Sequence, residues 1–179
     1  MNVVDTSIPD VKLIEPQVFG DHRGFFLETF HASRYRELAG IELDFVQDNH
    51  SRSAQGVLRG LHFQKTKPQG KLVRVVTGTV FDVAVDIRRN SPTFGKWEGQ
   101  ILSDENKRQF WVPPGLAHGF VVLSEYADFE YKCTDYYDPA DEGAIKWDDA
   151  DIGIIWPDEV APVLSEKDLA AKGFREQFG

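Results

Sequence analysis

Cysteine is nearly absent from this chain of 179 residues: Cys133 stands alone, so no disulfide can form within the chain. A single thiol is typical of proteins that work in a reducing compartment, and a cytoplasmic location is expected. The first residues lack a basic segment followed by a long apolar stretch, so no signal peptide is expected. The most apolar segment, residues 71–89, is interrupted by charges such as Arg74 and Asp82, so no membrane partner is expected.

Positive charge is also scarce, because 20 Lys and Arg stand against 29 Asp and Glu, for a net charge of −9. A general nucleic-acid surface needs a basic face, so a nucleic-acid partner is not expected. A small anionic ligand requires only a local cluster of cations, such as would bind a phosphate or pyrophosphate. The cations in strand-like or turn segments are Arg23, Arg59, Lys71 and Arg74. Pairing of these cations with the surplus carboxylates is an equally open interpretation.

Strand patterns dominate the chain. The residues from Val80 to Ile87 alternate between an apolar face and a face that carries Asp82 and Asp86, which predicts a half-buried strand. Residues 71–76 form another expected strand, joined to it across a hairpin-like break at Gly78. Further strand segments with turns between them occupy residues 18–30, 108–124 and 129–137. Short strands at such spacing predict a β-sandwich or barrel.

Helix signals are few and short. Residues 33–40 predict two helical turns, with Ser33 as the N-cap and Gly40 just past the end. Ser165 and Asp168 have the spacing of a capping box, which predicts a second short helix. With no repeat and no linker composition, residues 1–179 are expected to form one mainly β domain with short helices near its ends.

The histidines are the first candidates for acid–base chemistry near neutral pH. They are His22, His31, His50, His62 and His118. The first two lie in polar or helix-start contexts typical of surface residues, and the third suits a turn. The last two lie in apolar strand-like sequence, where a buried histidine with satisfied hydrogen bonds is the simpler interpretation of either one alone.

The segment "GVLRGLHFQ" at residues 56–64 places Arg59 and His62 in an apolar, glycine-rich run, where charge is avoided unless it is paired or used. Residues three apart on a strand point to opposite faces. Either Gly60 allows a bulge that redirects one side chain, or Arg59 acts on a partner subunit's side. No metal is expected, because this segment lacks a His-x-His pair, although distant carboxylates leave a three-ligand site open.

Other segments carry groups with two open interpretations. Asp168 can simply cap its helix, or it can orient a histidine. Tyr131 is a candidate general acid or a core aromatic residue. The amides of residues 47–49 suit recognition of a base or a sugar hydroxyl, or equally a turn. Cys133 is expected to be a buried strand residue, because nothing nearby marks it as an activated thiolate.

Almost the whole chain resembles the dTDP-4-dehydrorhamnose 3,5-epimerase family, through motifs that follow in the family's order. They read GDHRGFFLETF, GVLRGLHFQ, PQGKLVRVVTGTVFDVAVDIR, PPGLAHGF, YKCTDYY and LSEKD. The resemblance implies a jelly-roll β-sandwich or barrel of the cupin type, a homodimer that exchanges strands, and no metal or organic cofactor. It implies inversion of C3 and C5 of dTDP-4-dehydro-6-deoxy-D-glucose to give dTDP-4-dehydro-L-rhamnose, in dTDP-L-rhamnose biosynthesis.

The resemblance also implies roles for individual residues. His62 would be the base, Asp168 its orienting carboxylate, and Tyr131 the acid on the opposite face of the sugar. Lys71 would lie near the ketone oxygen. The positions that match substrate contacts in the family are Arg23, Glu28, Gln47, Asp48, Asn49, Arg59, His118, Tyr137, Glu142 and Lys167.

Three alternatives stay open at this point. The first is an epimerase that inverts only C3 or only C5 in another deoxysugar pathway. The second is a metal-dependent cupin enzyme, either an oxygenase or an isomerase. The third is a nucleotide-sugar binding module without catalysis. The sequence identifies neither the end product of the pathway nor the order in which C3 and C5 react.

Overall fold

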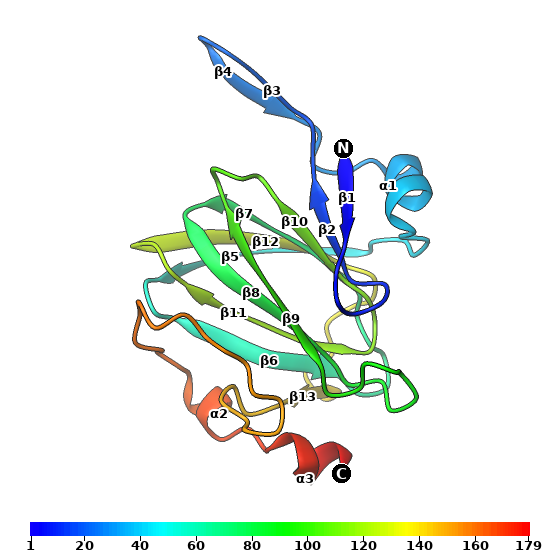
Figure 1. The fold of residues 1–179 in the computed structure, drawn as a ribbon, viewed down its shortest axis with the longest axis vertical. Coiled ribbons are helices and arrows are strands. Elements are labelled where there is room, and N and C mark those ends of the chain that lie inside the picture. The colour runs from blue at the N-terminus through cyan, green and yellow to red at the C-terminus, as the bar shows by residue number, and fades with distance from the viewer.

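The computed structural model describes residues 1–179 and places most of the strands in two antiparallel sheets (Figure 1). The six-stranded sheet runs in the order β1 (Asn2–Asp5), β2 (Lys12–Glu15), β10 (Gln109–Val112), β7 (Lys71–Thr77), β12 (Tyr126–Cys133) and β5 (Gln47–Ala54). The five-stranded sheet runs β13 (Glu142–Ala144), β6 (Leu58–Gln64), β11 (Leu116–Val122), β8 (Thr79–Asp86) and β9 (Trp97–Ser103).

From β5 onward, the chain changes sheet at every connection except the one between β8 and β9. This connectivity between two antiparallel sheets makes a jelly roll and confirms the expected sandwich. The expected hairpin-like break at Gly78 is wrong, because β7 and β8 belong to different sheets. Gly78 has a φ of 84°, and a Cβ there would lie 2.2 Å from the carbonyl oxygen of Tyr126, so the turn between sheets needs glycine.

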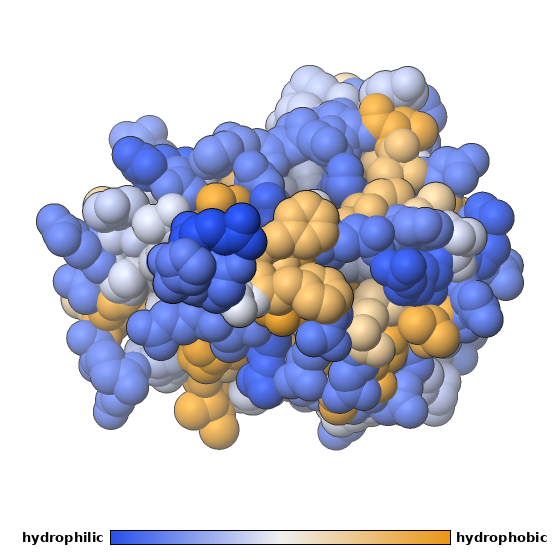
Figure 2. All heavy atoms as spheres, turned by 90° about the horizontal axis from the view of Figure 1, so that it is seen from above, coloured by the Kyte–Doolittle hydropathy of each residue, from blue (hydrophilic) through white to orange (hydrophobic).

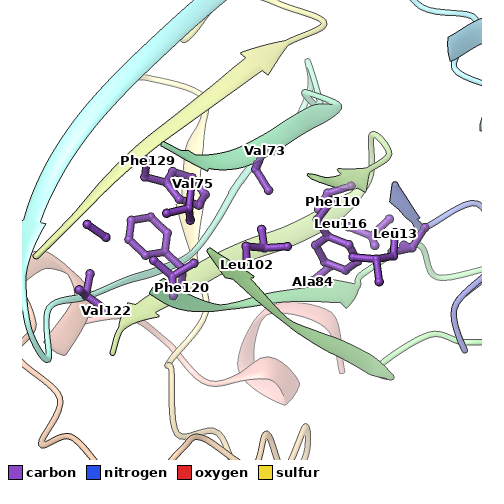
Figure 3. Close-up of a cluster of buried hydrophobic side chains, with 14 of the residues drawn as sticks. Leu13, Val73, Val75, Ala84, Leu102, Phe110, Leu116, Phe120, Val122 and Phe129 are labelled. Carbon is purple, nitrogen blue, oxygen red and sulfur yellow. The ribbon is translucent and has the colours of Figure 1, made fainter. Parts of the chain in front are cut away.

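The largest hydrophobic core lies between the two sheets (Figure 3). Among its side chains are Val73, Val75, Phe110 and Phe129 from the six-stranded sheet and Ala84, Leu102, Leu116, Phe120 and Val122 from the five-stranded sheet. The rings of Phe120 and Phe129 stack with centroids 4.2 Å apart. These two rings also border the cavity described below, so the core directly supports the site.

Both faces of β8 are buried, so the prediction that this strand is half-exposed is wrong. Val83 and Val85 pack with Ile152 and other residues of the C-terminal segment, which covers the outer face of the five-stranded sheet. Asp82 and Asp86 lie on the other face and are 0% exposed. The alternation of residue types was correct, but its polar face points into the sandwich, where each carboxylate has hydrogen-bond partners.

Three short helices complete the chain: α1 (Ala32–Ala39), α2 (Glu166–Leu169) and α3 (Phe174–Phe178). The N-cap of α1 is His31 rather than the predicted Ser33, because the His31 ring accepts the backbone N–H of Arg34. Gly40 ends this helix with a φ of 68°, as expected. Ser165 caps α2, as predicted, because its hydroxyl oxygen accepts the backbone N–H of Asp168. The Asp168 carboxylate does not complete the box; it pairs with His62 and with the Ser165 hydroxyl instead. No helix combines the length and the apolar character needed to cross a membrane.

A hairpin of β3 (Val18–Asp21) and β4 (Gly24–Leu27) forms a separate two-stranded sheet, as the sequence predicted. In Figure 1 it extends beyond the two main sheets as an arm. Phe19, Phe25 and Phe26 on this arm are exposed. Figure 2, which looks down from this end, shows hydrophobic side chains gathered among hydrophilic ones. Exposed aromatic rings on an isolated hairpin indicate a surface suited to contact with another chain.

Candidate active site

Arg59 and His62 reach the same cavity because β6 contains a bulge. His62 lies opposite His118 on β11, whereas Arg59 lies opposite Phe120. Three steps along β6 therefore match two steps along β11, and the extra residue returns the two side chains to one face. This arrangement favours the first of the two alternatives that the sequence left open, a bulge within the strand.

Glycine is required on both strands at this bulge. Gly60 has a φ of 133°, and a Cβ built on it would lie 2.6 Å from the Cα of Gly119. A Cβ on Gly119 would in turn lie 2.7 Å from the carbonyl oxygen of Arg59. The two backbones can approach this closely only without side chains. Gly60 of the "GVLRGLHFQ" segment and Gly119 on β11 therefore allow the bulge that turns Arg59 and His62 toward the cavity.

The cavity has a volume of about 300 Å³ and opens between β5, β6, β7, β11 and β12. Its walls are formed by Gln47, Asn49, Ser51, Arg59, His62, Phe63, Gln64, Gln69, Lys71, His118, Phe120, Phe129, Tyr131, Tyr137 and Glu142. Most residues that the family resemblance singled out are among them. The mixture of aromatic rings, amides and charged groups is typical of a site that binds a polar small molecule.

His62 forms a pair with Asp168, which α2 brings to the edge of β6. The His62 Nε2 lies 2.5 Å from Oδ1 of Asp168, and Nδ1 of the ring has no protein partner. The other carboxylate oxygen of Asp168 accepts the hydroxyl of Ser165. Burial alone would raise the pKa of Asp168, but the hydrogen bonds from His62 and Ser165 keep it below its usual value. An ionised carboxylate orients the imidazole so that its free nitrogen can take a proton.

Two cations face the cavity without a carboxylate partner. The side chain of Lys71 makes no hydrogen bond or ion pair, and its ammonium lies 5.8 Å from the ring centre of Tyr131. Arg59 donates Nε–H to the hydroxyl of Ser53 at 3.0 Å, while the rest of its guanidinium has no protein partner. In a chain of net charge −9, unpaired cations in one cavity indicate an anionic ligand. Arg74 is not part of this set, because it pairs with Glu130 at 2.7 Å outside the cavity.

Burial changes the acidity of two of these groups. It lowers the pKa of the Lys71 ammonium and raises the pKa of the Tyr131 hydroxyl. Tyr131 therefore stays protonated near neutral pH and can donate a proton. Lys71 becomes a stronger proton donor than a lysine in water, while nearby groups including Asp82 and Glu142 act against this effect.

The rim of the cavity is held by a hydrogen-bonded cluster. Glu142 accepts a hydrogen bond from the Tyr137 hydroxyl at 2.8 Å and another from the Lys167 ammonium. Burial would raise the pKa of Glu142, but these hydrogen bonds keep it below its usual value. Tyr137 also donates its backbone N–H to the side-chain oxygen of Gln47. The cluster leaves the half-exposed ring of Tyr137 at the entrance, where it can contact a ligand.

Four predicted contact residues do not line the cavity of this chain. Lys167 lies at the rim, where it pairs with Glu142, and the other three pair with residues elsewhere. Asp48 occupies the outward face of β5 and pairs with a lysine at 3.0 Å, because its neighbours Gln47 and Asn49 point inward. Arg23 lies on the arm and pairs with the carboxylate of its neighbour Asp21. Glu28 follows the arm and pairs with a residue of α1.

Several cavity residues were not found from the sequence. Ser51 lies on the inward face of β5, and its spacing from Gln47 and Asn49 was a usable signal. Asp82 does not line the cavity itself. The sequence assigned it to an exposed face, yet both its oxygens lie 2.9 Å from Nε2 of His118, which does line the cavity. The prediction that His50 suits a turn is also wrong, since it lies within β5. The others are Phe63, Gln64, Gln69, Phe120 and Phe129.

No three side chains of the types His, Cys, Asp and Glu gather where they could hold a metal ion. Cys133 is fully buried, as predicted, and burial raises the pKa of its thiol. The chemically capable groups of the cavity are therefore the paired histidine, the tyrosine and the unpaired lysine. These groups can remove a proton, donate a proton and stabilise developing negative charge.

A jelly roll whose cavity combines such acid–base groups with unpaired cations defines an enzyme that moves protons on an anionic substrate, as isomerases do. A family model described as dTDP-4-dehydrorhamnose 3,5-epimerase matches residues 5–176. The chain belongs to this family, whose jelly roll is of the cupin type, and it is an isomerase.

Two curated relatives and one solved structure illustrate how similar this chain is to known members of the family. An epimerase of this name from Pseudomonas aeruginosa is 58% identical over 98% of this chain and 97% of the relative. Another from Salmonella typhimurium is 60% identical over 96% of this chain and 94% of the relative. A Legionella pneumophila 3,5-epimerase, solved in complex with dTDP-4-keto-L-rhamnose, superposes with a TM-score of 0.95 at 60% identity. That alignment covers 97% of this chain and 93% of the other.

Proposed function

We propose that the chain inverts C3 and C5 of dTDP-4-dehydro-6-deoxy-D-glucose and releases dTDP-4-dehydro-L-rhamnose, a step of dTDP-L-rhamnose biosynthesis. The observation that carries this proposal is one cavity that holds His62, with Asp168 behind it, together with Lys71 and Tyr131. The names of the relatives and the ligand of the Legionella pneumophila structure support the same substrate class.

His62 removes the proton from each carbon beside the C4 ketone. The ketone makes these hydrogens acidic, because the electron pair left behind moves onto the ketone oxygen as an enolate. Asp168 holds the Nε2–H of the ring, so the unpartnered Nδ1 is the atom that takes the proton. The buried carboxylate also stabilises the imidazolium that forms.

Lys71 stabilises the enolate. Its ammonium has no competing partner in the protein, so it is free to meet the negative charge that develops on the ketone oxygen. A preorganised donor at such a position typically lowers the barrier by about 3 kcal/mol.

Tyr131 returns a proton on the opposite face of the sugar, which completes the inversion. Its hydroxyl is a donor at neutral pH and a poor base, and burial strengthens that preference by raising its pKa. Both inversions leave the oxidation state of the sugar unchanged, so no nicotinamide is required. Lys71 supplies the positive charge for the enolate oxygen, and we propose that the enzyme uses no cofactor.

The remaining groups of the cavity bind the nucleotide. The free N–H groups of Arg59 suit the pyrophosphate, and Ser53 holds the guanidinium in place. The exposed ring of Tyr137 suits contact with the thymine, and the amides of Gln47 and Asn49 suit its polar edge or the sugar hydroxyls. His118, Glu142 and Lys167 complete the proposed contacts.

We further propose a homodimer, in the cytoplasm, in which the arm of one subunit approaches the cavity of the other. The arm carries Arg23 and exposed aromatic rings, and it makes no sheet with the rest of its own chain. Such an exchange would bring Arg23 and Glu28 to a partner's ligand, although neither lies in its own cavity. Sedimentation equilibrium should give the mass of two chains of 20.3 kDa each, and the mass of one chain would contradict the dimer.

Solvent exchange tests the proposed reaction directly. Purified protein incubated with dTDP-4-dehydro-6-deoxy-D-glucose in D₂O, with a chelator present, should incorporate deuterium at both C3 and C5. Proton NMR of the product should show both centres inverted. Exchange at one carbon alone would support a single-centre epimerase, and exchange at neither would contradict the proposal. Activity that depends on an added metal would favour a metal-dependent enzyme.

A further inference from the structure

Asp82 is a fully buried carboxylate that the reaction described above does not use. It lies on β8, on the face that points between the sheets, and its exposure is 0%. Its side chain makes no ion pair with an arginine or lysine. Both carboxylate oxygens lie 2.9 Å from Nε2 of His118, which lines the cavity. Burying a carboxylate whose only hydrogen-bonding partner is a histidine lowers the stability of the fold, so a functional role for Asp82 is expected.

The contact fixes which nitrogen of His118 carries a proton. Burial raises the pKa of Asp82, while the charge and hydrogen bond of His118 and the charge of Lys71 act to lower it. With Asp82 ionised beside these two groups, both of its oxygens accept from Nε2 of His118, so this nitrogen carries a proton whether the ring is neutral or charged. The ring is also stacked against Phe129, with an angle of 23° between the planes, which restricts its rotation. Nδ1 has no protein partner, so it is the nitrogen of His118 left to contact a ligand.

The charge of Asp82 also acts on Lys71. Burial lowers the pKa of this lysine, and Asp82 is among the groups that raise it again. No carboxylate lies close enough to Lys71 to form an ion pair, so its ammonium depends on the field of charges at longer range. The groups that surround it from the packed strands are Asp82, Cys133 and Glu142, with His62, His118, Tyr131 and Arg59 on the same cavity.

We propose that Asp82 is a positioning residue of the epimerisation: it holds His118 with Nε2 protonated, and its negative charge keeps Lys71 an ammonium in the buried cavity. This inference rests on the proposed function, because it assigns Lys71 to the ketone oxygen. Asp82 touches no substrate atom in this arrangement and acts entirely through the two neighbouring side chains.

Asp86 is a matched control on the same strand. It lies four residues further along the same face of β8 and is also 0% exposed. It binds Arg88, Ser91 and Thr93 of the following loop and does not line the cavity. Burial would raise its pKa, but these hydrogen bonds lower it to about 2. Because the folded-state pKa is depressed, Asp86 stabilises the fold above its ordinary pKa, and this contribution is lost as the pH falls toward 2.

The pH dependence of kcat for exchange distinguishes the two carboxylates. Asp82→Asn removes the charge and keeps the shape, so kcat should fall about 10- to 100-fold, with a smaller change in KM. In Asp82→Asn, the decline of kcat at high pH should begin about one pH unit lower than in the wild type, because Lys71 loses its proton more readily. Asp86→Asn should keep the wild-type kcat per folded molecule and the wild-type decline of kcat at high pH. Its midpoint temperature of thermal unfolding should fall.

Two results would overturn the inference. One is an Asp82→Asn protein in which kcat declines at the same high pH as in the wild type, and in which the loss of activity matches the loss of folded protein. The other comes from ¹⁵N NMR of wild-type histidine side chains, which needs neither a variant nor the substrate. His118 should keep the proton on Nε2 between pH 6 and 9, and a proton found on Nδ1 alone would contradict the proposal. A wild-type enzyme that fails to exchange C3 and C5 would instead contradict the proposed function.

Discussion

The His62→Ala protein is expected to lose the exchange of both C3 and C5 by about 10³-fold or more, because no other group replaces the base. The Asp168 carboxylate remains but points at an empty space, and water at that position is a poor base at neutral pH. The affinity for dTDP should stay within about threefold, because the nucleotide contacts are made elsewhere in the cavity. Deuterium incorporation followed by NMR, with dTDP titrated by calorimetry, measures both quantities.

His50 supplies a matched control for this substitution. Its Nε2 lies 3.0 Å from Asp128, so it is also a histidine beside a carboxylate, but it does not line the cavity. His50→Ala should therefore retain wild-type exchange. If His62→Ala exchanged either carbon at the wild-type rate, His62 would not be the base at that carbon, and a second base would have to be sought in the cavity.

The second large effect is expected from Lys71→Met, which keeps the length of the side chain and removes its charge. Loss of a preorganised donor at the enolate oxygen costs about 3 kcal/mol, so kcat should fall by about 10²- to 10³-fold. KM should change less, because the ketone oxygen carries little charge before the proton leaves. Steady-state measurement of kcat and KM by product NMR provides the comparison.

The pH dependence adds a second signature to this prediction. Burial lowers the pKa of Lys71, so the wild-type kcat should decline with rising pH earlier than an ordinary lysine would cause. In Lys71→Met this decline should vanish. Lys132→Met is the control, since Lys132 pairs with Asp48 outside this cavity and should leave both kcat and its pH dependence unchanged. A Lys71→Met enzyme with a reduced affinity for dTDP and an unchanged kcat would assign Lys71 to the nucleotide instead.

Local features of the fold followed well from the sequence. The turn and two strands of the arm, the buried β6 and the N-cap at Ser165 are confirmed. Each depends on neighbours within a few residues, such as glycine in a turn or a hydroxyl before a helix. The N-cap predicted for α1 was wrong because two residues separated by only one position, His31 and Ser33, were both able to cap it. Local rules rank such candidates poorly when their hydrogen-bonding groups are so close in the chain.

The residues that make up the site could be predicted from the sequence only in part. The residues alone left His62, Tyr131 and Asp168 with two interpretations each, and it was the family resemblance that joined them. The structure brings His62 and Tyr131 to one cavity and sets Asp168 behind His62. It leaves Asp48 outside, and it adds Ser51 on the same strand.

By itself, the sequence determined the alternation of side chains along each strand, the turn of the arm, the end of α1 at Gly40 and the start of α2 at Ser165. Only the tertiary structure decided which face of a strand is enclosed, as at Asp82, and which distant residues meet, as with His62 and Asp168, 106 positions apart. The reason is that alternation shows only that neighbouring side chains point in opposite directions. Whether a direction leads to solvent, core or cavity depends on what the rest of the chain packs against that face.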